Sequence, residues 1–296
     1  MKNEKYLILN CDDFGVCACY NQAIIELLEA GVVSSATVIS PAGHFEEAAR
    51  WAAAHPAHSV GLHSCFTCGR EQENGGWAPL TSSPSLRREN GLMHRNNKQA
   101  ELHITDEAFE EEFAAQLQRC YDHNIPVTHV DNHTGSAYGL ETGRELISLI
   151  FKQIANKGLP FRLPRLRYGE SCDDRIPPQL AEMLRPLVAF ADAHDIFIPD
   201  CLIEHPYSPA AGMNYERFRD MMIRRITNIP ENMIVETYIH PAVPGREYGI
   251  TYDESSQRVW EHKLFLDPLC REAFEQAGVQ LITYQQAQAL RKAGKV

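Results

Sequence analysis

Short apolar and β-branched runs alternate along this chain with longer segments in which apolar residues recur every three or four positions. The short runs are typical of buried strands, and the longer segments predict amphipathic helices between them. The predicted strands lie at 6–10, 32–40, 59–63, 127–131, 159–163, 195–198, 233–238 and 279–283. The predicted helices lie at 21–30, 45–54, 106–123, 141–156, 178–193, 214–227, 255–277 and 284–293.

This alternation predicts an α/β fold, because repeated strand–helix units place parallel strands side by side with helical crossovers between them. Seven or eight such units in 296 residues favour a TIM-barrel-like (β/α) barrel of seven or eight mostly parallel strands. We expect a single barrel domain over residues 1–296. The alternation of strands and helices is interrupted in segment 69–104, which contains several glycines and prolines and is longer than an ordinary barrel loop. Insertions of that length commonly form lids or binding loops.

Charge and the first apolar run exclude several classes of partner. The chain has 28 Lys and Arg against 39 Asp and Glu, a net charge of −11, whereas nucleic acids and anionic membranes attract a basic face. The run at 6–9 is too short for a signal-peptide core or a membrane span. We therefore expect a cytoplasmic protein with no nucleic-acid or membrane partner. Its nine cysteines, an odd number, are then free thiols rather than a disulfide scaffold.

Titratable side chains follow the predicted strands at the end where barrel enzymes carry their catalytic groups. They are Asp12 and Asp13 after the first strand, His63 ending the third, His129, Asp131 and His133 at the fourth, Arg162 within the fifth, and His240 after the seventh. Because strand ends of a barrel converge, we expect these side chains to meet at one mouth.

Asp12 and Asp13 are adjacent in the sequence. On a regular strand their side chains would point to opposite sides, so the two carboxylates can hold different tasks. One can bind a metal while the other acts as a base. The alternative is an acidic pair that caps the following helix.

His129, Asp131 and His133 alternate, so on an extended segment they share one face. One histidine of this run, together with His63 and an aspartate, makes an Asp/His/His set that leaves positions open for water and substrate. Two imidazoles and one carboxylate suit zinc, cobalt, iron or manganese better than calcium. Magnesium is also compatible, although it prefers an all-oxygen shell.

Five motifs resemble, in order and approximate spacing, those of the YdjC-like carbohydrate deacetylases, a family related to the polysaccharide deacetylases. They are Leu-Asn-Cys-Asp-Asp-Phe-Gly at 9–15, Gly-Val-Val-Ser-Ser-Ala-Thr at 31–37, Val-Gly-Leu-His at 60–63, Thr-His-Val-Asp-Asn-His at 128–133 and Glu-Thr-Tyr-Ile-His-Pro at 236–241. Together these motifs extend over most of the chain. The resemblance implies a metal-dependent hydrolase that removes N-acetyl groups from an amino sugar or an oligosaccharide.

The same resemblance implies which residues hold the metal. Asp13, His63 and His133 would be the ligands, and Asp131 and His129 would support them from behind. The cofactor would be a divalent metal, zinc or magnesium first, with manganese and cobalt as alternatives.

The resemblance also implies the catalytic residues. Asp12 would be the general base and His240 the general acid that protonates the leaving amine. Arg162 falls where the family has an arginine near the active site, and would orient Asp12 or the substrate.

Three further residues are candidate substrate contacts. Trp77 in the insertion either stacks on a sugar face or packs the insertion onto the barrel. His205 follows the sixth predicted strand and could line the pocket. Tyr138 lies in 134–138, where the family usually has further histidines, so sugar contacts there can differ. The expected partners are an N-acetylated sugar and, from the family's habit, a second copy of the chain in a homodimer.

Two other functions use a similar fold. A metal-dependent sugar isomerase or epimerase also has carboxylates and histidines at a barrel mouth, but it needs no acid for a leaving amine. A non-catalytic carbohydrate-binding protein would have lost the base or a ligand, whereas all of these residues are present here. A serine-hydrolase elbow, Gly-x-Ser-x-Gly, and the glycine-rich nucleotide loops are absent from the sequence.

Overall fold

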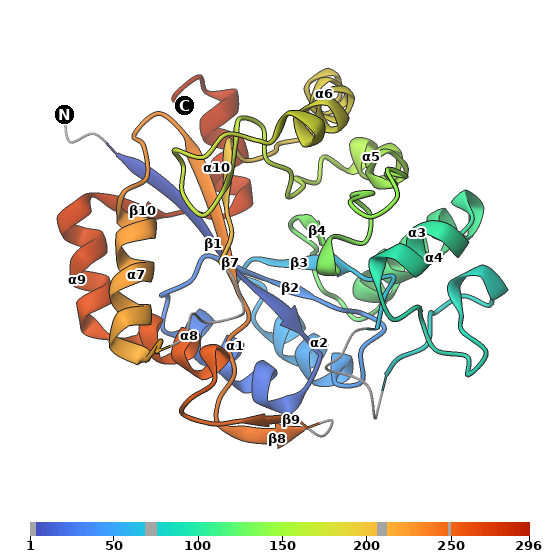
Figure 1. Ribbon diagram of the computed structural model, residues 1–296, viewed down its shortest axis with the longest axis horizontal. Coiled ribbons are helices and arrows are strands. Elements are labelled where there is room, and N and C mark those ends of the chain that lie inside the picture. Colours follow the sequence, from blue (N-terminus) through green and yellow to red (C-terminus); the bar gives the residue numbers. More distant parts are fainter. Residues whose placement is uncertain (1–3, 69–75, 206–211, 248–249) are drawn as a thin grey trace.

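The computed structural model describes residues 4–68, 76–205, 212–247 and 250–296, in which eight strands form one curled parallel sheet (Figure 1). The strands of this sheet are β1 Lys5–Phe14, β2 Ser35–Val38, β3 Val60–Ser64, β4 Val130–Asn132, β5 Arg167–Gly169, β6 Cys201–Ile203, β7 Ile234–Ile239 and β10 Val279–Leu281. Their order is β4-β3-β2-β1-β7-β6-β5, and β10 pairs with β1. The sheet is of the (β/α)-barrel kind, as predicted.

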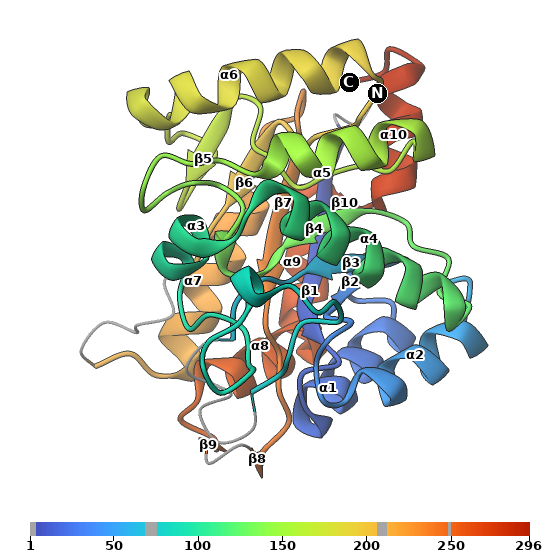
Figure 2. The same cartoon turned by 90° about the vertical axis from the view of Figure 1, so that its right-hand side faces the viewer.

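Helices surround this sheet on the outside (Figure 1). They are α1 Ala18–Glu29, α2 Phe45–Ala54, α3 Asn97–His103, α4 Asp106–Asp122, α5 Ile147–Ile154, α6 Pro178–Ala193, α7 Tyr215–Thr227, α8 Gln257–Leu266, α9 Pro268–Ala277 and α10 Tyr284–Lys292. Figure 2 shows the strands between α5 and α6 on one side and α1 and α2 on the other. Two short strands, β8 Gly245–Glu247 and β9 Ile250–Tyr252, pair antiparallel apart from the main sheet.

Two predicted strands are displaced in the structure. The segments 159–163 and 195–198 are not strands, and β5 and β6 begin a few residues later. Prolines at positions 160, 164 and 199 explain the difference, because proline cannot donate to a strand ladder. Segment 159–163 still bridges β4 and the segment before β6: Arg162 N donates to Val130 O at 3.1 Å, and Phe161 N donates to Phe197 O at 2.9 Å.

Two predicted helices are shorter or divided. The helix predicted at 255–277 is split into α8 and α9 at Pro268, which has no amide hydrogen to continue α8, while the Asp267 side chain caps α9. The helix predicted at 141–156 begins only at Ile147, because Gly139 and Gly143 adopt left-handed turns before it.

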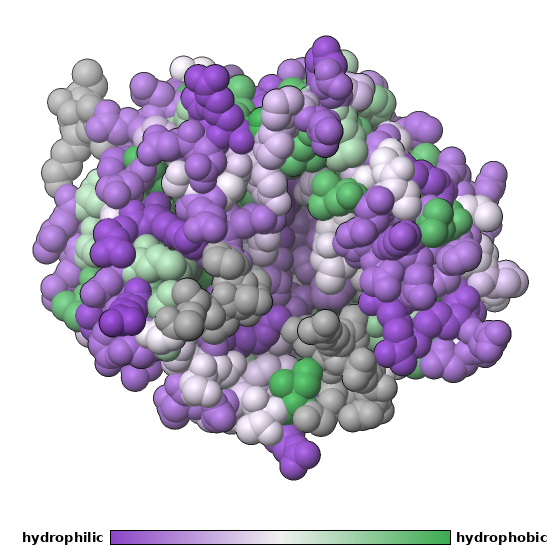
Figure 3. Space-filling model, viewed as in Figure 1, coloured by the Kyte–Doolittle hydropathy of each residue, from purple (hydrophilic) through white to green (hydrophobic). Residues whose placement is uncertain are grey.

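Within the described ranges, no helix is both long enough and apolar enough to cross a membrane. The face seen in Figure 3 is mostly hydrophilic, with scattered apolar residues. All nine cysteines are buried free thiols, as the sequence predicted.

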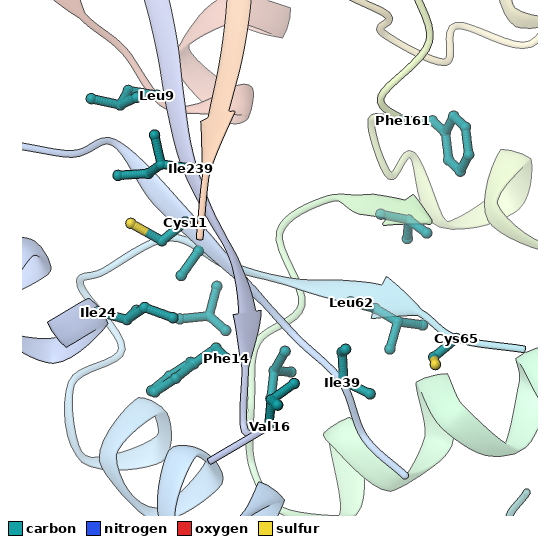
Figure 4. Close-up of a cluster of buried hydrophobic side chains, with 14 of the residues drawn as sticks. Leu9, Cys11, Phe14, Val16, Ile24, Ile39, Leu62, Cys65, Phe161 and Ile239 are labelled. Carbon is teal, nitrogen blue, oxygen red and sulfur yellow. The ribbon is translucent and has the colours of Figure 1, made fainter. Parts of the chain in front are cut away.

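The two sides of β1 explain where the core ends and the polar site begins. Leu7, Leu9 and Cys11 pack outward under the helices, with Ile24 of α1 on the same side (Figure 4). On the other side of the strand, facing the barrel interior, Tyr6 and Ile8 join an apolar cluster at one end. Further along the same side come Asn10 and Asp12, which are buried but polar. The interior therefore changes from apolar to charged toward the C-terminal ends of the strands.

Candidate functional site

A cavity of about 390 Å³ opens at the C-terminal ends of the strands. In Figure 3 the surface is hollowed near the centre of the face, with hydrophilic residues in its depth. The lining contains seven of the sequence-predicted site residues: Asp12, Asp13, His63, His133, Tyr138, Arg162 and His240. Side chains from β1, β3, β7 and the loops after β4 thus meet at one mouth, as expected for a barrel.

The two aspartates at the end of β1 both face the cavity. The expectation that adjacent side chains would point to opposite sides is therefore wrong here. The pairing of β1 with β2 shifts register between Cys11 and Phe14, and Asp13 has a left-handed φ of 67°. A bulge of this kind breaks the alternation of a strand and re-aims a side chain. Asp12 and Asp13 can therefore act on the same bound molecule.

Asp13, His63 and His133 bring three potential ligand atoms together. Asp13 Oδ1 lies 3.1 Å from His133 Nδ1 and 3.5 Å from His63 Nε2, and all three ligand atoms lie within 4.8 Å of one another. In the described part of the chain, Asp13 Oδ1 and His63 Nε2 are buried and make no hydrogen bond. Buried polar atoms are rarely left unpaired. The donor set therefore fits a divalent cation, and three protein ligands leave room for water and substrate.

Asp131 fixes the orientation of His63 from behind. Its Oδ1 lies 2.6 Å from His63 Nδ1, and its Oδ2 accepts a hydrogen bond from Thr37 Oγ1 at 2.9 Å. This arrangement leaves His63 Nε2 directed toward Asp13. Burial lowers the pKa of the His63 imidazole, but the Asp131 and Asp12 carboxylates outweigh burial and raise the pKa to about 9.

Arg162 binds carboxylates at the base of the cavity. Its Nη1 and Nη2 donate to the two oxygens of Asp12 at 2.7 and 2.8 Å. Nη2 also lies 3.0 Å from Asp131 Oδ2. Burial raises the pKa of Asp12, but the Arg162 guanidinium and the neighbouring histidines outweigh burial and hold the pKa at about 2. Asp12 is therefore ionised at neutral pH.

Glu236 of β7 is a site residue to which sequence reasoning assigned no role. Its Oε1 accepts a hydrogen bond from Arg162 Nε at 2.6 Å, and its other carboxylate oxygen accepts one from the Tyr284 hydroxyl. Burial raises the pKa of Glu236 to about 7 against the effect of Arg162. The signal was present in the sequence, because a glutamate inside an otherwise apolar strand requires a buried partner.

His240 lies at the end of β7, opposite His63. Its Nε2 is 3.9 Å from Asp12 Oδ2 and 3.9 Å from Asp13 Oδ2. Its backbone N–H donates to Glu261 Oε2 at 2.8 Å, which fixes this turn of the chain. Burial lowers the pKa of the His240 imidazole to about 4, so the ring is neutral at pH 7.

His129 and Tyr138 were also predicted at the site. His129 lies beneath it, stacked on Tyr284 with ring centroids 4.2 Å apart, and its Nε2 is 3.2 Å from Asn10 Oδ1. It is thus linked to the site through Asn10, whose Nδ2 donates to Asp12 at 2.8 Å. Tyr138 lines the cavity, and its hydroxyl donates to the backbone carbonyl of Arg162.

Trp77 and His205 do not contribute to the described cavity lining. Trp77 is 5% exposed and packs beside His133 with ring centroids 6.2 Å apart, so it packs the insertion onto the barrel. His205 is also buried, and its Nε2 lies 2.7 Å from Thr237 Oγ1. Trp77 thus has a packing role, and His205 is held by hydrogen bonding away from the described lining.

The remaining cavity wall was not predicted from the sequence. Its apolar part comes from α6 and β6, and its polar part centres on Glu204, which accepts a hydrogen bond from the Tyr238 hydroxyl at 3.0 Å. These wall residues include Leu180, Leu184, Leu202, Tyr168, Tyr238 and Glu204. Apolar residues of an amphipathic helix look the same in sequence whether they cover a core or a cavity.

Comparison with known proteins places the chain in a family. A profile of the YdjC-like protein family matches residues 6–276. Over 282 residues the chain is 30% identical to a carbohydrate deacetylase of Geobacillus stearothermophilus, covering 95% of this chain and 98% of that protein. A chitooligosaccharide deacetylase of Yersinia pestis is 33% identical over 171 residues, or 55% of this chain and 60% of that protein. An Enterococcus faecalis protein provisionally assigned to cellobiose-phosphate cleavage has a similar fold, with a TM-score of 0.73, 21% identity and coverage of 96% of this chain and 99% of that chain. The chain therefore belongs to the YdjC-like protein family.

Proposed function

We propose that this protein is a metal-dependent hydrolase that removes N-acetyl groups from an amino sugar or an oligosaccharide. One observation carries the proposal: unpaired buried atoms of Asp13 and His63 meet His133 directly beside Asp12 and His240 at the base of a cavity. Relatives named as carbohydrate and chitooligosaccharide deacetylases support the reaction class.

Asp13, His63 and His133 would hold the divalent ion. A bound ion of this kind lowers the pKa of water and polarises a carbonyl oxygen, which is what amide hydrolysis requires. Two imidazoles in the set favour zinc, whereas magnesium favours oxygen ligands, with manganese and cobalt as further candidates. Asp131 would keep His63 in the orientation that presents Nε2.

Asp12 would take the proton of the attacking water. Arg162 binds both oxygens of this carboxylate, which keeps it ionised and fixes its plane. His240 would then protonate the leaving amine, without which an amide nitrogen leaves poorly. Because the His240 ring is neutral at rest, it must first receive a proton, and Asp12, whose Oδ2 lies 3.9 Å away, would pass on the proton that it takes from water. The proton removed from water thus ends on the amine.

The sugar would lie against the mixed wall of the cavity. Leu180 and Leu184 of α6 offer an apolar surface for the face of a sugar ring, and Glu204 offers a carboxylate for its hydroxyl groups. Tyr138 and Tyr238 flank this surface near Arg162. The products are acetate and the free amino sugar.

The proposal extends to the organisation of the protein. We also propose that the protein is a single barrel domain over residues 1–296, that it lies in the cytoplasm and that it forms a homodimer. Its negative net charge supports the absence of a nucleic-acid partner. Sedimentation of the purified chain tests the dimer.

Acetate release tests the function. A panel of N-acetylated mono- and disaccharides is incubated with the protein, with and without chelator, and acetate is measured. We expect metal-dependent release that falls by a factor of about 10² to 10⁴ in Asp12→Asn and disappears in His63→Ala. His194→Ala, which changes an exposed histidine outside the cavity, is the matched control. Rearranged sugar without acetate would instead indicate an isomerase, and release unaffected by chelator and by both substitutions would exclude the mechanism.

A further inference from the structure

Thr134, the residue directly after His133, has a strained backbone. Its φ and ψ are 55° and 7°, in the left-handed region. A β-branched residue rarely adopts this conformation, and it persists only where surrounding contacts enforce it. The strain lies one peptide bond away from a candidate metal ligand, so the contacts that enforce it bear on the site.

Asn97 supplies those contacts from the insertion. It is the first residue of α3, and its Nδ2 donates to the Thr134 carbonyl oxygen at 2.6 Å. The Thr134 hydroxyl lies 2.9 Å from Asn97 Oδ1, where it can donate, and 3.0 Å from Thr67 Oγ1. One amide side chain thus binds both the backbone and the side chain of the strained residue.

The turn that Thr134 begins also positions His133. The Ser136 backbone N–H donates to the His133 carbonyl at 3.2 Å, and its hydroxyl donates to the same oxygen at 3.1 Å. These bonds form only if the chain reverses at Thr134. His133 Nδ1 then lies 3.1 Å from Asp13 Oδ1.

We propose that Asn97 is a positioning residue: it holds Thr134 in the left-handed conformation and thereby directs His133 toward Asp13. This gives Asn97 of segment 69–104 a task at the site. The part that concerns metal affinity rests on the proposed function, whereas the part that concerns the conformation of the turn does not.

Four proteins test the proposal: the wild type, Asn97→Ala, Thr134→Gly and the double variant. Glycine adopts left-handed angles without strain, so Thr134→Gly should remove most of the need for Asn97. Hydrogen exchange of the amides at 134–138 is measured by mass spectrometry in metal-free protein. Affinity for Zn²⁺ is measured by competition with a chelator. Lys98→Ala, an exposed neighbour on α3, is the matched control.

We expect Asn97→Ala to speed exchange in this turn and to weaken Zn²⁺ binding about tenfold. Without the Asn97 contacts, Thr134 leaves its strained conformation more often, and strain of this kind corresponds to a population shift of about that size. In the Thr134→Gly background the same substitution should have an effect at least about three times smaller. Unchanged exchange in Asn97→Ala, or equal effects in both backgrounds, would overturn the proposal. If the wild type releases no acetate, the proposed function fails while the exchange comparison still decides the role of Asn97.

Discussion

Binding of a divalent ion at Asp13, His63 and His133 should release a proton from His63. The pKa of this imidazole is about 9 in the ion-free structure, because the Asp131 and Asp12 carboxylates outweigh burial. Only the neutral ring can bind a metal, so affinity is linked to pH. The raised pKa favours the protonated ring below pH 9, and metal affinity must fall as the pH falls below that value.

The magnitude follows from the same pKa. Below pH 9, affinity should fall about tenfold for each pH unit, since one proton competes with the ion. At pH 7 this amounts to a loss of about 100-fold, or about 2.7 kcal/mol, relative to the high-pH limit. A histidine with an ordinary pKa near 6.5 would lose less than about twofold at pH 7. The two cases are easily separated by experiment.

Chelator-buffered Zn²⁺ titrations between pH 6.5 and 9.5 measure this dependence, and calorimetry in two buffers of different protonation enthalpy counts the released proton. Asp131→Asn removes the charge that raises the His63 pKa most, so the pH range in which Zn²⁺ affinity falls steeply should move to lower pH. The high-pH affinity should also fall about 10- to 100-fold, because the ring loses its orienting partner. Asp192→Asn, a surface carboxylate paired with Arg165, is the matched control.

A flat affinity between pH 7 and 9, without proton release, would refute the electrostatic assignment of His63. An Asp131→Asn variant that keeps the wild-type pH dependence would refute the role of Asp131 in particular.

Two further predictions concern stability and substrate binding. Arg162→Met should lower the free energy of unfolding, measured with urea, by about 3 to 5 kcal/mol, because it leaves buried carboxylates without their cation. Arg165→Met, which removes one partner of an exposed ion pair, is the control. An equal loss of stability in the two variants would contradict the role assigned to Arg162. Glu204→Gln should raise KM for the sugar several-fold with kcat nearly unchanged, since it weakens hydrogen bonds to hydroxyl groups away from the reacting amide; an unchanged KM would place the sugar elsewhere in the cavity.

The barrel and most of the charged cluster could be predicted from the sequence, because both depend on the order of residue types along the chain. Strand periodicity located the C-terminal strand ends, and those ends converge in any barrel. His63 was found in this way and lines the cavity, with Asp131 paired behind it. Arg162 also reaches the cavity, although its segment is not a strand in the structure.

Backbone irregularities could not be predicted in the same way. The bulge at Asp13 reverses the expected direction of its side chain, and nothing in Asp-Asp-Phe-Gly distinguishes it from a regular strand end. The left-handed turn at Thr134 is held by Asn97, 37 residues away in the chain. Such a contact depends on tertiary packing, which periodicity does not encode. The displaced strands β5 and β6, by contrast, follow from prolines that were visible in the sequence.

The charges buried around the cavity give an independent reason to expect a cation. Burying an ionised carboxylate is costly unless an opposite charge accompanies it. Among the described residues, the base of the cavity contains four buried carboxylates, those of Asp12, Asp13, Asp131 and Glu236, and the buried guanidinium of Arg162, while the less buried Arg258 also lines the cavity. In the ion-free state, protonation of His63 and partial protonation of Glu236, whose pKa is about 7, offset part of the excess. A divalent ion would offset more of the buried negative charge than the proton that it displaces from His63. The high pKa of His63 therefore follows from the excess of buried negative charge, which a divalent ion at this site would also offset.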